Sequence, residues 1–301
     1  MSHLPSILPL LLAGLSPVSV SADILLPDPS YGRIPLSFTI NEGQTADNVA
    51  FLSSRGGSSA FFTATGTTYV LSRETRESTA KRASLDPHER RDIPAEHESF
   101  ALTCSFVGAN ANPAIRGEGR QSWNCNYFIG NDPDRWRTDV PNFERIRIEE
   151  LYDGIDLVYH GADGAMKYDF IVSPGTNPDV IRLRYDFGDE GGVLSINSQK
   201  ELVASTTGGE IVERAPYAYQ RINGREIPVD VSYRIIDADA GLYGFTPGEY
   251  DPKHALVIDP ELVLTYSTYL GGSTMTGCTV WRWMVKGVSI LRGNLVPEIF
   301  R

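Results

Sequence analysis

Four oxygen-bearing side chains in one turn-rich stretch have the chemistry to bind a metal ion. They are Asn131, Asp132, Asp134 and Asp139. Carboxylate and carbonyl oxygens are the ligands that calcium prefers, but the stretch lacks the central glycine and the distal glutamate of an EF-hand loop. Arg135 and Arg137 would also offset its negative charge. We therefore expect no cofactor, and a calcium ion on these four residues is the alternative.

The three cysteines, Cys104, Cys125 and Cys278, have no spacing typical of a zinc site. Cys104 and Cys125 each lie in a strand-like run, and in an exported protein they could form a disulfide. Such a bridge would stabilise the fold by about 3 kcal/mol. Two buried thiols are the alternative, and the sequence leaves both interpretations open.

No recognised catalytic motif is present in the sequence. The segment 88–92, His-Glu-Arg-Arg-Asp, lacks the second histidine of a zinc protease motif. The segment 117–119, Gly-Glu-Gly, lacks the third glycine of a dinucleotide-binding loop. The five histidines, at positions 3, 88, 97, 160 and 254, are scattered along the chain. We therefore predict that the protein is not an enzyme and has no catalytic residues.

The charge of the chain limits its partners. Its 301 residues include 27 Lys and Arg against 38 Asp and Glu, which gives a formal net charge of −11. Such a charge repels phosphate groups and argues against nucleic acid or anionic lipid as the main partner. Hydrophobic residues make up 41% of the chain, which is enough to form a folded core.

Short strands are the elements expected to position these residues. Apolar and polar residues alternate with a period of two between Gly, Pro, Asn and Asp turns, which is typical of half-buried antiparallel strands. The runs are 36–40, 49–52, 60–63, 68–71, 143–148, 155–159, 167–172, 180–185, 201–204, 210–213, 217–220, 229–235 and 255–258. Asn223-Gly224 carries a strong hairpin signal. We predict an all-β fold with little helix, either an antiparallel sandwich or an open barrel.

One segment departs from this pattern. Residues 73–98 are crowded with charged side chains and contain few apolar ones. We predict that they form a mobile, solvated loop.

The start of the chain is typical of a secretory signal peptide. An apolar stretch, Leu4–Leu15, precedes Val20-Ser21-Ala22, a small-residue cleavage pattern just before Asp23. The stretch is too short to span a bilayer as a helix. The region before it lacks Lys and Arg, so a buried N-terminal segment is the alternative. We predict a secreted or cell-surface protein with no transmembrane segment in the mature chain.

A series of motifs between Leu36 and Ser273 resembles a known domain. The motifs are Phe38–Gln44, Val107–Asn110, Asn126–Pro133, Trp136–Pro141, Tyr152–Tyr159, Tyr168–Gly175, Ala215–Gln220, Tyr250–Pro252, Leu256–Pro260 and Tyr266–Ser273. In this order they resemble an uncharacterised all-β domain that precedes SBBP (β-propeller) repeats in large exported bacterial proteins. The resemblance implies an extracellular all-β module and supplies no catalytic residues. Asp153 departs from it, where the family more often has Pro.

We therefore divide the chain into a signal peptide (1–22), an all-β module (23–265), the start of a propeller repeat (266–273) and a tail (274–301). The tail has a different character, with four basic residues and one acidic residue between 275 and 301. When it is back-translated and read from the third base of each codon, Trp283-Met284 must encode Asp and Met284-Val285 must encode Gly. That frame resembles a propeller repeat, so we expect the tail to be an out-of-frame product that truncates the propeller.

These observations predict a non-catalytic module with a structural or interaction role, whose partner is an unidentified protein or glycan at the cell surface. A carbohydrate-binding or glycoside-cleaving domain is an alternative, with Tyr217 and Tyr219 as a stacking platform. Tyrosines that alternate with alanine favour packing in the core, so we expect these two rings to be buried. A calcium-dependent adhesin is a further alternative.

Overall fold

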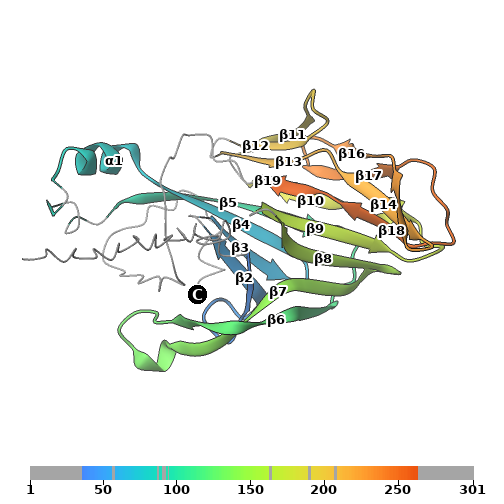
Figure 1. Ribbon diagram of the computed structural model, residues 1–301. Helices are drawn as coiled ribbons and strands as arrows, with labels where there is room; N and C mark the ends of the chain where they lie inside the picture. Colours follow the sequence, from blue (N-terminus) through green and yellow to red (C-terminus); the bar gives the residue numbers. More distant parts are fainter. Residues whose placement is uncertain are drawn as a thin grey trace, which may run out of the picture. The chain divides into compact units, whose positions relative to one another are not determined.

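A single antiparallel β-sheet dominates the computed structural model of the chain (Figure 1). The structure describes residues 36–263 except 56–57, 87, 90–92, 94, 163–164, 189–190 and 207–208. Within these residues it contains nineteen strands, one α-helix and two short 3-10 helices. The all-β prediction is therefore confirmed.

The strands follow one another along the chain with short connections. They are β1 (Phe38–Ile40), β2 (Val49–Arg55), β3 (Ser58–Thr63), β4 (Gly66–Glu74), β5 (His97–Phe106), β6 (Ala114–Tyr127), β7 (Arg137–Tyr152), β8 (Ile155–Ala162), β9 (Ala165–Val172), β10 (Leu183–Asp186), β11 (Gly192–Ile196), β12 (Leu202–Thr206), β13 (Gly209–Glu213), β14 (Tyr217–Ile222), β15 (Arg225–Val229), β16 (Val231–Asp237), β17 (Leu242–Pro247), β18 (Leu256–Asp259) and β19 (Glu261–Val263). The helices are α1 (Arg76–Ala83), η1 (Pro133–Arg135) and η2 (Pro178–Val180).

Fifteen of the strands form a nearly closed, barrel-like circuit. Its pairing order is β16, β17, β10, β5, β4, β3, β2, β1, β7, β8, β9, β19, β13, β12 and β11. The circuit comes close to closure where Leu194 of β11 donates its N–H to the carbonyl of Ala238, just after β16, at 3.3 Å. An open barrel, one of the two predicted architectures, is therefore the better description.

Four strands lie outside this circuit. β6 pairs with β7 between Arg137 and Glu149, while β18 pairs with β9 and with β14, which in turn pairs with β15. β14 and β15 join through Asn223 and Gly224, which have φ values of 53° and 75°. Two positive φ values favour a tight hairpin turn, as the Asn-Gly sequence predicted.

The alternation of residues along the strands separates an inner from an outer side of the sheet. On β9, Tyr168 and Phe170 are buried inside, whereas Lys167 and Asp169 lie on the outer side. The core is rich in aromatic rings, such as Phe170, which contacts Tyr168 and Phe245 edge-on. Because large rings fill the inner side of β9, its charged residues Lys167 and Asp169 lie outside.

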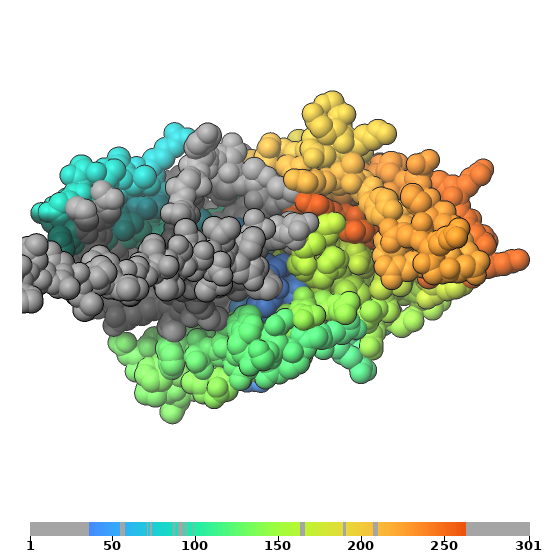
Figure 2. Space-filling view, in the orientation of Figure 1, coloured from blue at the N-terminus to red at the C-terminus, as the bar shows by residue number. Residues whose placement is uncertain are grey.

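The segment 73–98 is more ordered than its composition suggested. β4 and β5 extend into it and pair as far as Glu74 and His97. Between them, α1 begins after Thr75, whose side chain accepts a hydrogen bond from the N–H of Ser78. Figure 2 shows this part of the chain, in blue-green, at one end of the sheet. The segment was predicted to be a mobile, solvated loop, but part of it forms α1 and the paired ends of β4 and β5, because a helix cap and strand pairing stabilise regular structure where apolar residues are few.

Several predictions fall on other parts of the chain. The signal peptide (1–22), the propeller start (266–273), the tail (274–301) and Cys278 lie outside the described residues. Among the described residues, no helix has the length and apolar character that a membrane span needs.

Candidate functional site

A buried carboxylate lies at the centre of the inner side. Glu213, the last residue of β13, is only 1% exposed. Its Oε1 accepts hydrogen bonds from the hydroxyls of Tyr185 at 2.6 Å and Tyr243 at 2.7 Å. Its Oε2 accepts from Tyr233 at 3.2 Å and also from Tyr168. Tyrosines from β9, β10, β16 and β17 therefore converge on one side chain.

The surroundings of Glu213 change the pKa of its carboxyl in opposite directions. Burial raises the pKa of the Glu213 carboxyl, and the hydrogen bonds from the tyrosines lower it by a smaller amount. Burial, together with the nearby carboxylate, raises the pKa of Tyr168, Tyr185 and Tyr233 well above the ordinary tyrosine value. These hydroxyls therefore remain protonated donors at neutral pH.

The space beside this cluster is too small for a substrate. A cavity of about 10 Å³ lies among Tyr69, Cys104, Tyr159, Glu213 and Tyr243. That volume holds about one water molecule. The Glu213 cluster therefore joins strands of the core and offers no room for a larger ligand.

A wider hollow of about 750 Å³ lies at the surface between turns, beside Asn110, Glu150 and Thr176. Its polar groups already hold the turns: Asn110 Nδ2 donates to the Glu150 carbonyl at 3.4 Å, and Glu150 Oε2 accepts from the Gly154 N–H at 2.9 Å. Asn110 belongs to the motif Val107–Asn110 and Gly154 to the motif Tyr152–Tyr159, so these two motifs hold the turns that border the hollow.

The outer side of four adjacent strands carries a denser group of functional side chains. We call it the outer face, and it consists of His160 on β8, Asp169 on β9, Asp259 on β18, and Tyr217 and Tyr219 on β14. The strand register brings these residues together. Tyr217 pairs directly with Asp259, and Ile258 pairs with Phe170, which places Asp259 beside Asp169.

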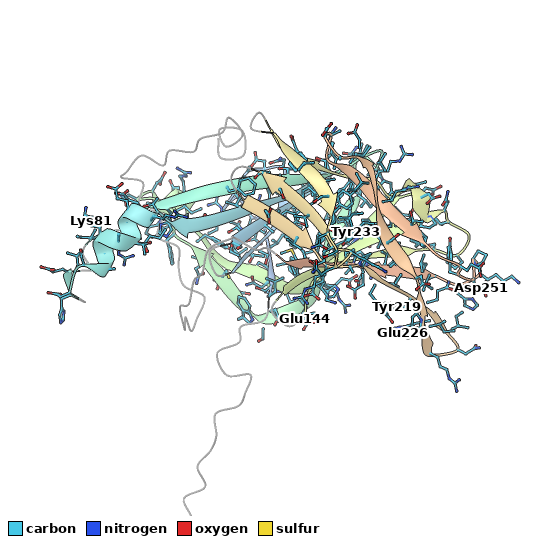
Figure 3. The ribbon with its side chains drawn as sticks, turned by 90° about the horizontal axis from the view of Figure 1, so that it is seen from above. Lys81, Glu144, Tyr219, Glu226, Tyr233 and Asp251 are labelled. Atoms are coloured by element: carbon cyan, nitrogen blue, oxygen red, sulfur yellow. The ribbon has the colours of Figure 1, made fainter. Side chains whose placement is uncertain are left out.

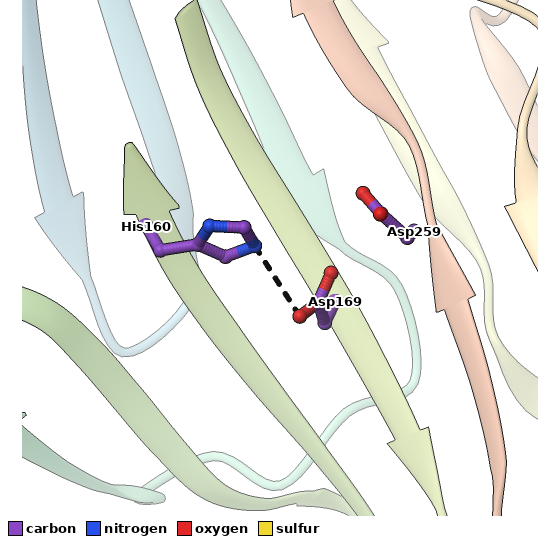
Figure 4. Close-up of side chains that lie close together, drawn as sticks. All are labelled: His160, Asp169 and Asp259. Atoms are coloured by element: carbon purple, nitrogen blue, oxygen red, sulfur yellow. Dashed lines mark ion pairs between the residues drawn. The ribbon is translucent and has the colours of Figure 1, made fainter. Parts of the chain in front are cut away.

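Three of these residues lie close enough to share one ion (Figure 4). A ring nitrogen of His160 and one carboxylate oxygen each from Asp169 and Asp259 lie within 4.8 Å of one another. His160 Nε2 is 3.3 Å from Asp169 Oδ2. The three side chains are between 19% and 27% exposed, so solvent reaches them from the outside only.

The nearby carboxylates of Asp169 and Asp259 change the pKa values within this group. Burial raises the pKa of Asp259, and the charge of Asp169 raises it further. The Asp169 carboxylate raises the pKa of His160, while burial of the ring opposes that change. Lys167 lies on the other side of Asp259, with Nζ 3.5 Å from its carboxylate oxygens.

The two tyrosines of the outer face point into solvent, which corrects the prediction that they pack in the core. Tyr217 is 42% exposed, whereas the alternate residues Ala218 and Gln220 are buried. The Tyr217 and Tyr219 rings stack with a centroid distance of 5.7 Å and an interplanar angle of 28°. Figure 3 shows Tyr219 close to Glu226 on this part of the sheet. Two flat rings are therefore presented together.

Charged groups border the two rings. The Tyr217 hydroxyl donates to Glu226 Oε1 at 3.1 Å, and the Arg221 guanidinium lies 5.6 Å from the centre of the Tyr219 ring. Aromatic rings beside hydrogen-bonding groups can bind a ligand that has both apolar faces and hydroxyl groups.

The four calcium candidates lie elsewhere, around η1, and all are exposed: Asn131, Asp132, Asp134 and Asp139. Asp132 Oδ1 accepts a hydrogen bond from the Asp134 N–H at 3.1 Å and so caps η1. Among the described residues, His160, Asp169 and Asp259 form a group of side chains that could hold a metal ion. Asp132, Asp134 and Asp139 do not form such a group.

The two described cysteines are not joined to each other. Cys104 is buried in the barrel, with Sγ 3.8 Å from the Tyr243 hydroxyl, and Cys125 lies on β6 near Asn142. Of the two interpretations left open by the sequence, the structure shows buried thiols. Burial raises the pKa of the Cys104 thiol, so it stays protonated and unreactive.

Sequence reasoning missed the role of His160, Asp169, Asp259 and Glu213. Asp259 precedes Pro260, a pair that is common in turns, but it is the last residue of β18. A weak signal was present, since His160 and Asp169 both occupy polar positions of alternating runs that follow each other closely in the sequence. Asp259 is distant in sequence and gives no such signal.

Comparison with known proteins found one match. The sequence model of a family described as "Domain of unknown function (DUF7948)" matches residues 38–261. No curated protein and no solved structure matches the chain. The match covers every strand of the outer face and the Glu213 cluster.

Proposed function

Because the chain belongs to the DUF7948 family, a domain of unknown function, we propose its function from its geometry. We propose that it is a non-catalytic interaction module of a secreted or cell-surface protein, and that it binds a carbohydrate through the outer face. The outward orientation of Tyr217 and Tyr219 is the observation that carries this proposal.

The packing of the barrel supports this choice of surface. The described interior is filled by aromatic and aliphatic side chains around Glu213, and the cavity there has room for about one water molecule. A ligand larger than water must therefore bind on the outside. On the outside, Tyr217 is the large aromatic side chain that lies beside an open group of polar residues.

The chemistry of the face favours a sugar. The flat faces of the tyrosine rings complement the C–H groups of a pyranose ring, and Glu226 and Arg221 can bond its hydroxyl groups. The net charge of −11 and the carboxylates of the face oppose acidic polymers. A neutral glycan is therefore the ligand class that the surface fits best.

The place of the module in a longer protein is also part of the proposal. The signal peptide pattern supports export, and the resemblance of Tyr266–Ser273 to a repeat supports a β-propeller after this module. In that arrangement the carbohydrate-binding domain directly precedes the propeller in the chain.

Replacing Tyr217 or Tyr219 with alanine is expected to weaken glycan binding about fivefold each, because each ring contributes about 1 kcal/mol of stacking. The measurement is a glycan array on the purified full-length chain, followed by titration calorimetry with the strongest ligand. Trp136→Ala is the matched control, since Trp136 is also exposed, at 39%, and lies near η1, away from the outer face.

The control variant should bind like the wild type. If the wild type binds no glycan on the array, or if the Tyr217 and Tyr219 variants bind as tightly as Trp136→Ala, the proposal is wrong. The module would then serve only as a structural support for the propeller.

A further inference from the structure

We propose that His160, Asp169 and Asp259 form a binding site for one divalent transition-metal ion, with Zn²⁺ as the best-fitting example. The three residues lie on adjacent strands and present one nitrogen and two oxygen ligands to a common point (Figure 4). This proposal does not depend on the carbohydrate proposal, because the metal ligands do not include the tyrosines.

The distances suit a tetrahedral ion. Zinc lies about 2.0–2.2 Å from nitrogen and oxygen ligands, so two ligands of a tetrahedral site are about 3.3–3.5 Å apart. His160 Nε2 and Asp169 Oδ2 are 3.3 Å apart. Asp259 needs only a small side-chain movement, since all three ligand atoms already lie within 4.8 Å of one another. The solvent-facing side leaves a fourth position for water.

One polar atom of this cluster has unused bonding capacity. Asp169 Oδ1 is buried and has no hydrogen-bond partner, while Oδ2 of the same carboxylate lies 3.3 Å from His160 Nε2. A buried carboxylate oxygen without a partner is costly, and an ion at this point would satisfy it.

The charges around the site leave room for a cation. Asp259 lies 3.5 Å from the ammonium group of Lys167, and Asp169 contacts the His160 ring. Glu261 is shared between Lys167 and Arg214, at 3.8 Å and 3.3 Å. These three carboxylates outnumber the cations Lys167 and Arg214 by one, and a divalent ion would bring further positive charge to them.

The donor set selects the type of metal. Calcium and magnesium prefer sites made of oxygen ligands, whereas an imidazole nitrogen favours zinc, cobalt, nickel or copper. A site with one histidine and two carboxylates is thus distinct from the calcium site considered for residues 131–139.

The test is titration of the EDTA-treated full-length chain with Zn²⁺ at pH 7.5 by calorimetry. We expect one site that is weakened at least about 100-fold in His160→Ala, since even the loss of a group behind a ligand costs about 10–100-fold. His254→Ala is the matched control, because His254 Nδ1 contacts a single carboxylate, Asp251, at 3.0 Å. The control should keep the affinity of the wild type.

Two further measurements guard against a misfolded variant. The Asp169→Asn variant keeps the shape of the side chain and should also lose Zn²⁺ affinity. Thermal unfolding of the metal-free variants checks that they fold. Co²⁺ should give a visible absorption band of a four-coordinate site in the wild type only. Equal Zn²⁺ affinity in His160→Ala and the wild type, or no wild-type binding below millimolar Zn²⁺, would overturn the proposal. Glycan binding measured in EDTA tests the carbohydrate proposal separately.

Discussion

Replacing Glu213 with alanine is expected to lower the free energy of unfolding by about 3–5 kcal/mol. The substitution removes the acceptor of the Tyr168, Tyr185 and Tyr243 hydroxyls, all of which are buried. Tyr233 keeps a second acceptor, the Arg214 carbonyl at 2.9 Å. Buried donors without an acceptor cost about 1–3 kcal/mol each, and the gain from no longer burying a carboxylate offsets part of that cost. Urea denaturation monitored by circular dichroism measures the loss.

The matched variant for this prediction is Glu213→Gln, which keeps the size and one acceptor oxygen but has no charge. It should lose less stability than the alanine variant. If Glu213→Ala changes the free energy of unfolding by less than about 1 kcal/mol, the tyrosines do not depend on Glu213 and the description of the core is wrong.

Glu213→Gln also isolates a pH effect. Because the folded protein raises the pKa of Glu213, it binds the proton more tightly than the unfolded chain does. The stabilisation from this proton is complete below the unfolded pKa of about 4.3 and is lost as pH rises through the folded value. The stability of the wild type relative to Glu213→Gln should therefore fall as the pH rises from 4 to 8.

Replacing Gly241 with alanine should destabilise the fold by about 3 kcal/mol. Gly241 has a φ of 67°, and a Cβ there would overlap the carbonyl oxygen of Tyr185. The same turn supports β10, because the Tyr185 N–H donates to the Gly241 carbonyl at 3.0 Å. The left-handed backbone contributes about 1–2 kcal/mol of this cost, and the displacement of β10 contributes the rest.

Gly224→Ala separates these two contributions. Gly224 has a similar φ of 75°, but no atom lies within 4 Å of its added Cβ. It should cost only about 1 kcal/mol, the backbone part alone. Equal losses for the two variants in urea denaturation would show that Gly241 does not pack closely against β10.

The fold could be predicted from the sequence because two-residue alternation and turn residues are local signals. They located strands such as β8 and β9 and the Asn223-Gly224 hairpin. The order of the strands in the barrel could not be predicted, because pairing of β5 with β10 joins residues far apart in the chain. Helix α1 was missed because its stabilisation comes from a cap and charged pairs, such as Arg82 with Glu74, in a segment with few apolar residues.

The orientation of β14 was the main error, and it has a physical cause. Alternation shows that Tyr217 and Tyr219 share one face, but it does not show which face is buried. The apolar area of the tyrosine rings favoured their burial, yet Gln220 is the residue that is buried, because its Nε2 donates to the carbonyls of Asp251 and His254 at 2.8 and 3.0 Å. A polar side chain whose hydrogen bonds are satisfied by a nearby turn can therefore take the buried position.

The burial of Glu213 on the inner side could not be predicted from the alternation either. In the run 210–213, Ile211 and Glu213 share a face, so the pattern allows a buried glutamate but gives no reason for it. The reason lies in tyrosines that are 20 to 45 residues away along the chain. Only the folded sheet brings them together.

One set of tyrosines faces inward on Glu213, while another faces outward beside His160, Asp169 and Asp259. Limited nitration of the folded full-length chain, with each tyrosine read by peptide mass spectrometry, tests this arrangement directly. Among the tyrosines that the structure describes, we predict that Tyr217 is modified first and Tyr219 next, while Tyr168, Tyr185 and Tyr243 stay unmodified until the protein unfolds. Protection of Tyr217 and Tyr219 together with early nitration of Tyr185 or Tyr243 would contradict the claim.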